Sequence, residues 1–312
     1  MTALISGSMA FDTIMVFKDR FANHILPDQV HILNVAFVVP EMRREYGGCA
    51  GNIAYNLRLL GERGVPLASV GADFGVYTDW LERWDIPRDH IIALDDHYTA
   101  QAYITTDMDD NQITAFHPGA MGEAHRVSVP AGYDNPVGIV APNGPDAMVQ
   151  HAEQFKAAGI PFIFDPGQGL PMFDGEALLR FIDQATWVAV NDYESQLMQE
   201  RTGLDLDGIA ERVEALVVTR GGEGSWIFTG GKQIQIPAVE PEQVLDPTGC
   251  GDAYRAGLLF GLGRGLDWEV TGRIASLMGS IKIAKHGTQN HYFDLDEFRR
   301  HYEAAFGEAM PV

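Results

Sequence analysis

Basic residues and cysteines are scarce in this chain. Its 312 residues contain 22 Lys and Arg against 43 Asp and Glu, which gives a formal net charge of -21. So acidic a surface does not neutralise a run of backbone phosphates, and we expect no nucleic-acid partner. The two cysteines, Cys49 and Cys250, lie in glycine-rich, loop-like sequence. This excludes a disulfide framework and is typical of a reducing compartment.

Membrane and metal-cluster signals are also missing. No run approaches 18 uncharged apolar residues, and the first residues, Met-Thr-Ala-Leu-Ile-Ser-Gly, have no basic or long apolar segment. We therefore expect a cytoplasmic protein with no membrane partner. There is no zinc spacing such as C-x-x-C and no Gly-x-x-x-x-Gly-Lys-Ser/Thr loop. A small anionic substrate would have to be met locally, by backbone amides and a metal ion.

The second half of the chain alternates short apolar runs with helical spacing, the pattern of βαβ units. The runs are Gly138 to Ala141, Pro161 to Phe164, Trp187 to Val190 and Ala215 to Val218. Each ends in polar or turn residues, which should converge because the carboxyl ends of parallel strands line the ligand crevice. With 46% hydrophobic residues the chain can bury a full core. We expect one doubly wound α/β domain over residues 1–312.

Two stretches with extended character stand apart from this pattern. Residues 13–45 are rich in Val, Ile and Phe without helical spacing, and Val30 to Val39 in particular indicates a strand. The stretch 98–117 is also extended and is broken by a turn-like cluster at 107–111. Together they predict a small sheet, which is either a lid or a plain β-extension. Its exposed edge would permit a homodimer through the lid.

The stretch Asp246-Pro-Thr-Gly-Cys-Gly-Asp252 precedes a helix-compatible run that ends at Arg264. The glycines on either side of Cys250 predict a tight loop that leads into a helix N-terminus. Such a loop points several backbone N–H groups at one spot, where an anion such as a polyphosphate is held. Asp252 then either accepts a proton from a hydroxyl that attacks the bound phosphate, or caps the helix, a role worth about 1 kcal/mol.

An earlier glycine-rich stretch, Tyr46-Gly-Gly-Cys-Ala-Gly-Asn52, precedes another helical pattern. The paired glycines allow a ligand to approach the backbone closely, and Asn52 offers both a donor and an acceptor. The alternative is an ordinary turn with a capping Asn. Asp12 follows the probable strand Leu4 to Ser6, and its carboxylate either accepts two hydrogen bonds from a vicinal diol or is a solvated loop residue.

Two further motifs also have a structural alternative. Asn191-Asp-Tyr-Glu194 has the spacing of a capping box, and its carboxylate also suits a hard cation. Thr219-Arg-Gly-Gly-Glu-Gly224 leads into a predicted hairpin with a Gly230-Gly231 turn. Its glycines either let a nucleotide pack on the backbone or serve the turn alone.

These motifs, in this order, resemble those of the ribokinase-like (PfkB) carbohydrate and nucleoside kinases. The stretch Asp246 to Gly257 is similar to the family's C-terminal signature Asp-Thr-x-Gly-Ala-Gly-Asp, with Cys250 in place of Ala. Gly47-Gly48-x-x-x-Asn52 is similar to its N-terminal signature, and Asn191-x-x-Glu194 to its motif near the phosphates. The resemblance covers nearly the whole chain. It implies a mostly parallel sheet flanked by helices, with a small β-sheet lid.

The resemblance also implies a reaction, transfer of the γ-phosphoryl group of ATP to a primary alcohol. Asp252 would accept the hydroxyl proton, and the amides of Gly249, Cys250 and Gly251 would stabilise charge on the moving phosphoryl group. Because the loose transition state demands little basicity, a carboxylate of ordinary pKa would suffice. The residues implied to hold the sugar hydroxyls are Asp12, Gly47, Gly48 and Asn52.

Nucleotide and cation sites follow from the same resemblance. Glu194 would organise waters around Mg²⁺, and Asp246 and Thr248 would be the first ligands of a monovalent cation such as K⁺, with carbonyls from around 284–287 as further ligands. The residues implied for the ATP site are Asn191, Thr219, Gly221, Gly222, Gly224 and Gly287.

The most detailed expectation concerns the substrate. Gly47-Gly-Cys-Ala-Gly-Asn52 and Gly287-Thr-Gln-Asn-His291 look like the bacterial adenosine kinases of the family, so phosphorylation of adenosine to AMP is expected first. Tyr103 and Phe116, in the lid stretch, would sandwich the purine ring, although aromatic residues in strands also serve packing. The alternatives are a sugar kinase acting on ribose, fructose or a related sugar, and a non-catalytic nucleoside-binding protein.

Overall fold

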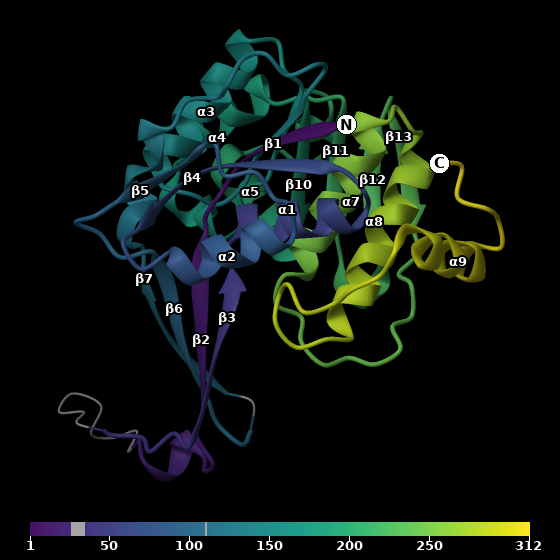
Figure 1. Cartoon of the computed structure of the whole chain (residues 1–312). Coiled ribbons are helices and arrows are strands. Elements are labelled where there is room, and N and C mark those ends of the chain that lie inside the picture. The colour runs from purple at the N-terminus through teal and green to yellow at the C-terminus, as the bar shows by residue number, and fades with distance from the viewer. Residues whose placement is uncertain (26–34, 110) are drawn as a thin grey trace.

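The computed structural model describes residues 1–25, 35–109 and 111–312 (Figure 1). Its main sheet has nine strands, of which all but the edge hairpin β12–β13 run parallel. In sheet order the strands are β13 (Lys232–Ile236), β12 (Ser225–Thr229), β11 (Ala215–Thr219), β10 (Trp187–Asn191), β9 (Phe162–Phe164), β8 (Val137–Val140), β1 (Thr2–Ser6), β4 (Arg63–Gly71) and β5 (Ile91–Leu94).

Helices cover both faces of this sheet, because alternate strand residues point to opposite sides and both sides are apolar. In β1, for example, Ala3 and Ile5 join one core cluster and Leu4 joins the other. The helices of the first cluster are α1 (Cys49–Leu59), α2 (Gly75–Arg83), α7 (Cys250–Gly263), α8 (Trp268–Ile283) and α9 (Leu295–Phe306). Those of the second are α3 (Pro145–Ala157), α4 (Gly175–Gln184), α5 (Asp192–Thr202) and α6 (Leu206–Ala210). The predicted doubly wound α/β fold is confirmed.

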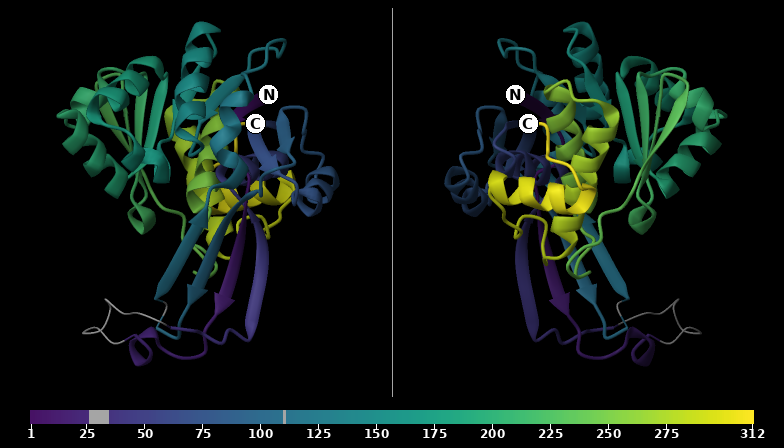
Figure 2. Two further views of the ribbon diagram at one scale, coloured as in Figure 1. Left: turned by 90° about the vertical axis from the view of Figure 1, so that its left-hand side faces the viewer. Right: turned by 90° about the vertical axis from the view of Figure 1, so that its right-hand side faces the viewer.

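A separate four-stranded sheet extends away from the main body (Figures 1 and 2). Its order is β3 (Glu41–Gly47), β2 (Ala10–Val16), β6 (Ala100–Thr106) and β7 (Gln112–His117). These strands come from the two excursions expected from the sequence. Their boundaries differ by a few residues, since β2 already begins at Ala10.

The strand expected at Val30 to Val39 does not form where the structure describes it. Residues 30–34 lie outside the described part of the chain, and residues 35–39 belong to no strand. The partner of β2 is instead the charged segment Glu41–Gly47, which pairs along its full length from Ala10 opposite Gly47 to Val16 opposite Glu41. Strand pairing, rather than β-branched side chains, decides which segment is a strand here.

The hairpin at the edge of the main sheet forms as predicted. Thr229 and Lys232 pair across the two-residue loop Gly230-Gly231, whose φ angles are 54° and 70°. Two successive positive φ values are what a tight hairpin turn requires, and glycine adopts them without a steric cost. Within the described residues, no helix combines the length and the apolar character needed to cross a bilayer.

Candidate active site

The N-termini of α1 and α7 meet, and this brings together two motifs that lie 200 residues apart in the chain. Asn52, in the first turn of α1, donates a hydrogen bond from Nδ2 to Oδ2 of Asp252 at 2.7 Å. Asp252 lies in the first turn of α7. The Asn expected to contact the sugar is thus bound directly to the predicted proton acceptor.

Asp252 is not the cap of its helix. The N-cap of α7 is Gly249, which adopts a left-handed φ of 79° and receives no side-chain capping bond. Only glycine adopts this conformation without strain, so the loop requires it. The simple capping role that the sequence left open for Asp252 is therefore excluded.

The buried position of Asp252 changes its acidity. Burial raises the pKa of Asp252 to about 7, although the bond from Asn52 and the charge of Arg255 favour the ionised form; Asp165 adds to the rise. An ordinary pKa would suffice for the expected reaction; the raised pKa results from burial, which is a property of the fold and not of the local sequence. A carboxylate with a pKa near neutrality is a better proton acceptor than an ordinary one.

The amides of the predicted anion-binding loop are not equivalent. The Cys250 N–H donates to the carbonyl of Pro247 at 3.1 Å, so it is already engaged in the turn. The amides of Gly249 and Gly251 have no hydrogen-bond partner within the described residues. No atom lies within 4 Å of the position that a Cβ on Gly251 would occupy, so space is open there. Gly249 and Gly251 are thus the predicted members that remain free to bind an anion.

Arg255 is a site residue that sequence reasoning missed. It lies one turn after Asp252 on α7, is 4% exposed, and donates from Nη2 to Oδ1 of Asp165 at 3.1 Å. Its Nε and Nη1 are buried and have no partner within the described residues. Asp165 follows β9, as the strand-end argument expected. The sequence feature that could have identified Arg255 is its position as a charged residue among apolar residues near a helix N-terminus.

Asn191 and Glu194 form the capping box that the sequence allowed. The Glu194 N–H donates to Oδ1 of Asn191 at 2.7 Å, and the Asn191 N–H donates to Oε2 of Glu194 at 2.8 Å. Burial raises the pKa of Glu194, with Asp165 adding to the effect and Arg255 opposing it. Each carboxylate oxygen still has a lone pair to offer water, so the capped Glu194 fits Mg²⁺ held through water. A cluster of three or more His, Cys, Asp or Glu with metal-binding geometry is absent from the described chain.

Asp12 and the paired glycines lie against each other, where β2 and β3 leave the main body. A Cβ on Gly47 would lie 2.5 Å from Oδ2 of Asp12, and a Cβ on Gly48 would lie 2.5 Å from the carbonyl of Ser8. Gly48 also has a φ of 84°. Burial raises the pKa of Asp12 to about 6, helped by Asp246 and Glu45. Gly48 is therefore required by its φ and by the nearby backbone, whereas a Cβ on Gly47 would displace the side chain of Asp12.

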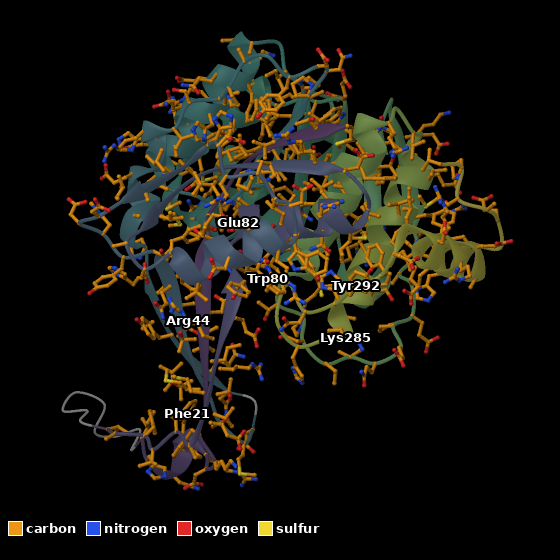
Figure 3. The ribbon with its side chains drawn as sticks, viewed as in Figure 1. Phe21, Arg44, Trp80, Glu82, Lys285 and Tyr292 are labelled. Atoms are coloured by element: carbon orange, nitrogen blue, oxygen red, sulfur yellow. The ribbon has the colours of Figure 1, made fainter. Side chains whose placement is uncertain are left out.

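Gln289 is a second residue that the sequence did not single out. Its Nε2 donates to Oδ1 of Asn52 at 2.9 Å and to Oη of Tyr77 at 2.7 Å, and Tyr77 donates to the carbonyl of Gly47 at 2.9 Å. Trp80, labelled in Figure 3, donates from Nε1 to Oε1 of Gln289 at 2.8 Å. This network fixes the amide orientation of Asn52, so that its nitrogen faces Asp252.

Tyr103 and Phe116 cannot sandwich a ring between them. Phe116 pairs with Ala102, the neighbour of Tyr103, so the two aromatic side chains project from opposite faces of the small sheet. They are 43% and 54% exposed. The register places Phe116 on the same face as Asp12, which also pairs with Ala102. The sequence placed both residues in strands but could not give the register that separates them.

The residues expected at the nucleotide lie in two places. Asn191 and Thr219 are paired at the carboxyl ends of β10 and β11, and the glycines 221, 222 and 224 follow at the same edge. Gly221 and Gly224 have positive φ values of 53° and 84°. Gly287 lies apart, in the loop after α8, where its N–H donates to Oδ2 of Asp246 at 2.9 Å.

Asp246 and Thr248 form the turn that enters α7. The Thr248 N–H donates to Oδ1 of Asp246 at 2.9 Å, so both oxygens of this buried carboxylate accept backbone hydrogen bonds. Burial opposes ionisation, but the N–H groups of Gly287 and Thr248 hold the pKa of Asp246 below its ordinary value. Asp246 is therefore an ionised anchor of the loop.

Comparisons with known proteins find nucleoside kinases that are similar to this chain. A nucleoside kinase of Methanocaldococcus jannaschii is 34% identical to this chain over 261 residues, which cover 83% of this chain and 85% of the relative. A solved structure of a Burkholderia thailandensis nucleoside kinase in complex with inosine has a TM-score of 0.90 at 50% identity, covering 98% of this chain and 99% of that one. A structure of the same enzyme with ADP-inosine gives a TM-score of 0.87.

The family model described as pfkB family carbohydrate kinase matches residues 22–294. This range contains the Gly47-Gly48 pair, the capping box of α5 and the loop that leads into α7. The chain therefore belongs to the pfkB family of carbohydrate kinases and is a phosphotransferase that acts on an alcohol group.

Proposed function

We propose that this protein is a nucleoside kinase that transfers the γ-phosphoryl group of ATP to the 5'-hydroxyl of a purine nucleoside, with adenosine as the first candidate. The observation that carries the proposal is the 2.7 Å bond between Asn52 and Asp252, which joins the proposed ribose site to the proposed proton acceptor. The nucleoside kinases among its relatives support a nucleoside over a free sugar.

Asp252 is the proposed general base. It accepts the proton of the 5'-hydroxyl while the hydroxyl oxygen forms its bond to the γ-phosphorus, and ADP leaves with the electron pair of the broken P–O bond. Its pKa of about 7 leaves a large ionised fraction at neutral pH and a strong drive to take the proton. The free amides of Gly249 and Gly251, at the positive end of α7, stabilise charge on the moving phosphoryl group.

The ribose is held between the two sheets in this proposal. The carboxylate of Asp12 accepts hydrogen bonds from the 2'- and 3'-hydroxyls, close to the backbone of Gly47 and Gly48. Asn52 contacts the ribose from the main body, and Phe116 offers one aromatic face to the base. This arrangement requires a diol, so 2'-deoxynucleosides should be poorer substrates than ribonucleosides.

ATP binds at the edge formed by the carboxyl ends of β10 and β11 in the proposed complex. Mg²⁺, when bound, neutralises phosphate charge, and the half-buried Glu194 orients its waters. Arg255 holds Asp165 beside Glu194, which limits the repulsion between these two carboxylates.

The proposal is tested by measuring ADP release with adenosine, inosine, ribose and fructose 6-phosphate, each with and without Mg²⁺. We expect turnover with the nucleosides, dependent on Mg²⁺, and little with the sugars. Asp252→Asn serves as the inactive control for contaminating kinases. A higher kcat/KM with ribose or fructose 6-phosphate would favour a sugar kinase. If none of the four acceptors gives ADP release, a non-catalytic nucleoside-binding protein is favoured.

A further inference from the structure

Lys282, in the last turn of α8, is fully buried, with 0% of its side chain exposed. Its Nζ donates to the carbonyl of Asp246 at 2.7 Å and to the carbonyl of Lys285 at 3.3 Å. Figure 3 labels Lys285 in the loop after α8. Lysine is almost never fully buried unless its charge is compensated, because burying a charged group costs free energy. The buried position of this ammonium group therefore calls for a structural or functional explanation.

The two carbonyls belong to the two segments that form the base of the anion-binding loop. Asp246 starts the turn that leads through Gly249 into α7, and Lys285 precedes Gly287, whose N–H binds the Asp246 carboxylate. The amide of Asp246 also donates to the carbonyl of Ile283 at 3.1 Å. One ammonium group therefore ties the loop before α7 to the end of α8.

These contacts test the expected monovalent cation site. Both carboxylate oxygens of Asp246 accept backbone N–H groups. The carbonyl of Ala284 accepts from Gln243 at 3.2 Å, and that of His286 accepts from Asn290 at 3.0 Å. The carbonyls of Asp246 and Lys285 both accept from Lys282. A K⁺ bound to the carbonyls of Asp246 and Lys285 would lie beside this fixed ammonium group, and the repulsion between the two like charges disfavours an exchangeable K⁺ there.

A plain helix cap does not account for this lysine. Lysines in the last turn of a helix often bind the final carbonyls of their own helix, and they do so at the surface. Lys282 is buried and also binds the carbonyl of Asp246, 36 residues away in the chain. Burial lowers the pKa of Lys282, while the nearby Asp246, Cys250 and Asp252 favour its charged form.

We propose that the Lys282 ammonium group is a built-in monovalent cation of this kinase: it holds the anion-binding loop in place and supplies the positive charge beneath it, so that activity does not depend on K⁺. It is a positioning residue, since it acts through the loop and does not contact substrate. The inference rests on the proposed kinase function for its kinetic readout and on the contacts of Lys282 for its structural one.

The first experiment compares the wild-type protein in KCl, NaCl and choline chloride at equal ionic strength. We expect equal rates of adenosine phosphorylation and equal melting temperatures in all three salts. A rate that rises steeply with K⁺, or melting that K⁺ selectively stabilises, would overturn the proposal. The melting comparison still decides if adenosine is not the substrate, so failure of the proposed function is distinguishable.

The second experiment removes the charge. Lys282→Met should lower kcat by about a hundred-fold with little change in the KM for the nucleoside, because a preorganised charge is lost from the loop. Lys282→Ala leaves room for an ion, so K⁺ or ammonium should restore part of its activity and raise its melting temperature relative to choline. Lys156→Met, an exposed last-turn lysine of α3, is the matched control. A fully active Lys282→Met, or a folded Lys282→Ala that responds to no cation, would contradict the inference.

Discussion

At the scale of single residues, Asp252 combines burial with a charged neighbourhood, and its pKa of about 7 is the property most open to test. Asp252→Asn should lower kcat by about a thousand-fold while substrate affinity stays within a few-fold, because general base catalysis is lost but the bond to Asn52 can still form.

For the wild-type protein, kcat should fall as pH drops below about 7, where Asp252 is protonated. Steady-state kinetics from pH 5 to 9 measure the kcat of the wild-type protein and of Asp252→Asn. Near-normal turnover of Asp252→Asn would show that Asp252 is not the general base.

The same residue affects stability, with a sign that follows from the direction of the shift. A carboxyl group whose pKa is raised in the folded state stabilises the fold most below its unfolded pKa, and this contribution is lost as pH rises through about 7. The melting temperature of Asp252→Asn relative to the wild-type protein should therefore increase between pH 4 and pH 8.

At the scale of elements, α7 places Gly249, Asp252 and Arg255 at intervals of three residues, so all three lie on one face at its N-terminal end. Arg255 favours the ionised form of Asp252. Arg255→Met should therefore move the acidic limb of the pH–rate profile to higher pH. It should also destabilise the fold by about 3–5 kcal/mol, because Asp165 is left buried and unpaired.

The control for this change is the double variant Arg255→Met with Asp165→Asn, which should recover much of the stability. Chemical denaturation measures the free energy of unfolding of each variant, and pH–rate profiles measure the shift. An unchanged acidic limb in a folded Arg255→Met protein would show that Arg255 does not act on Asp252.

The small sheet permits a paired test of its register. Phe116 shares a face with Asp12, whereas Tyr103 points to the other side. Phe116→Ala should raise the KM for the nucleoside by about ten-fold, the loss expected for one aromatic stacking contact. Tyr103→Ala should leave KM unchanged, although both side chains are about half exposed. Equal effects of the two substitutions on KM would contradict the proposed nucleoside position.

At the scale of the whole molecule, an acidic chain binds an anionic substrate by concentrating positive potential in one place. The formal net charge is -21, yet Arg255 and Lys282 are buried near the N-terminus of α7. Helix dipole, free amides and these two cations act at the same end of the main sheet. Charge distribution, rather than net charge, is what makes this fold compatible with ATP.

The local sequence determined the elements and the motifs at their ends. Apolar runs predicted the strands, Gly230-Gly231 predicted the hairpin, and the glycines around Cys250 predicted the loop into α7, because these features depend on neighbouring residues only. Family resemblance added the order of the motifs and the reaction class.

Only the tertiary structure decided what depends on residues far apart in the chain. The bond between Asn52 and Asp252, the raised pKa of Asp252, the pair of Arg255 with Asp165 and the ammonium of Lys282 beneath the loop all require segments brought together by folding. The opposite faces of Tyr103 and Phe116 likewise depend on strand register. Burial and pairing set electrostatic energies, and no local pattern of residues contains either.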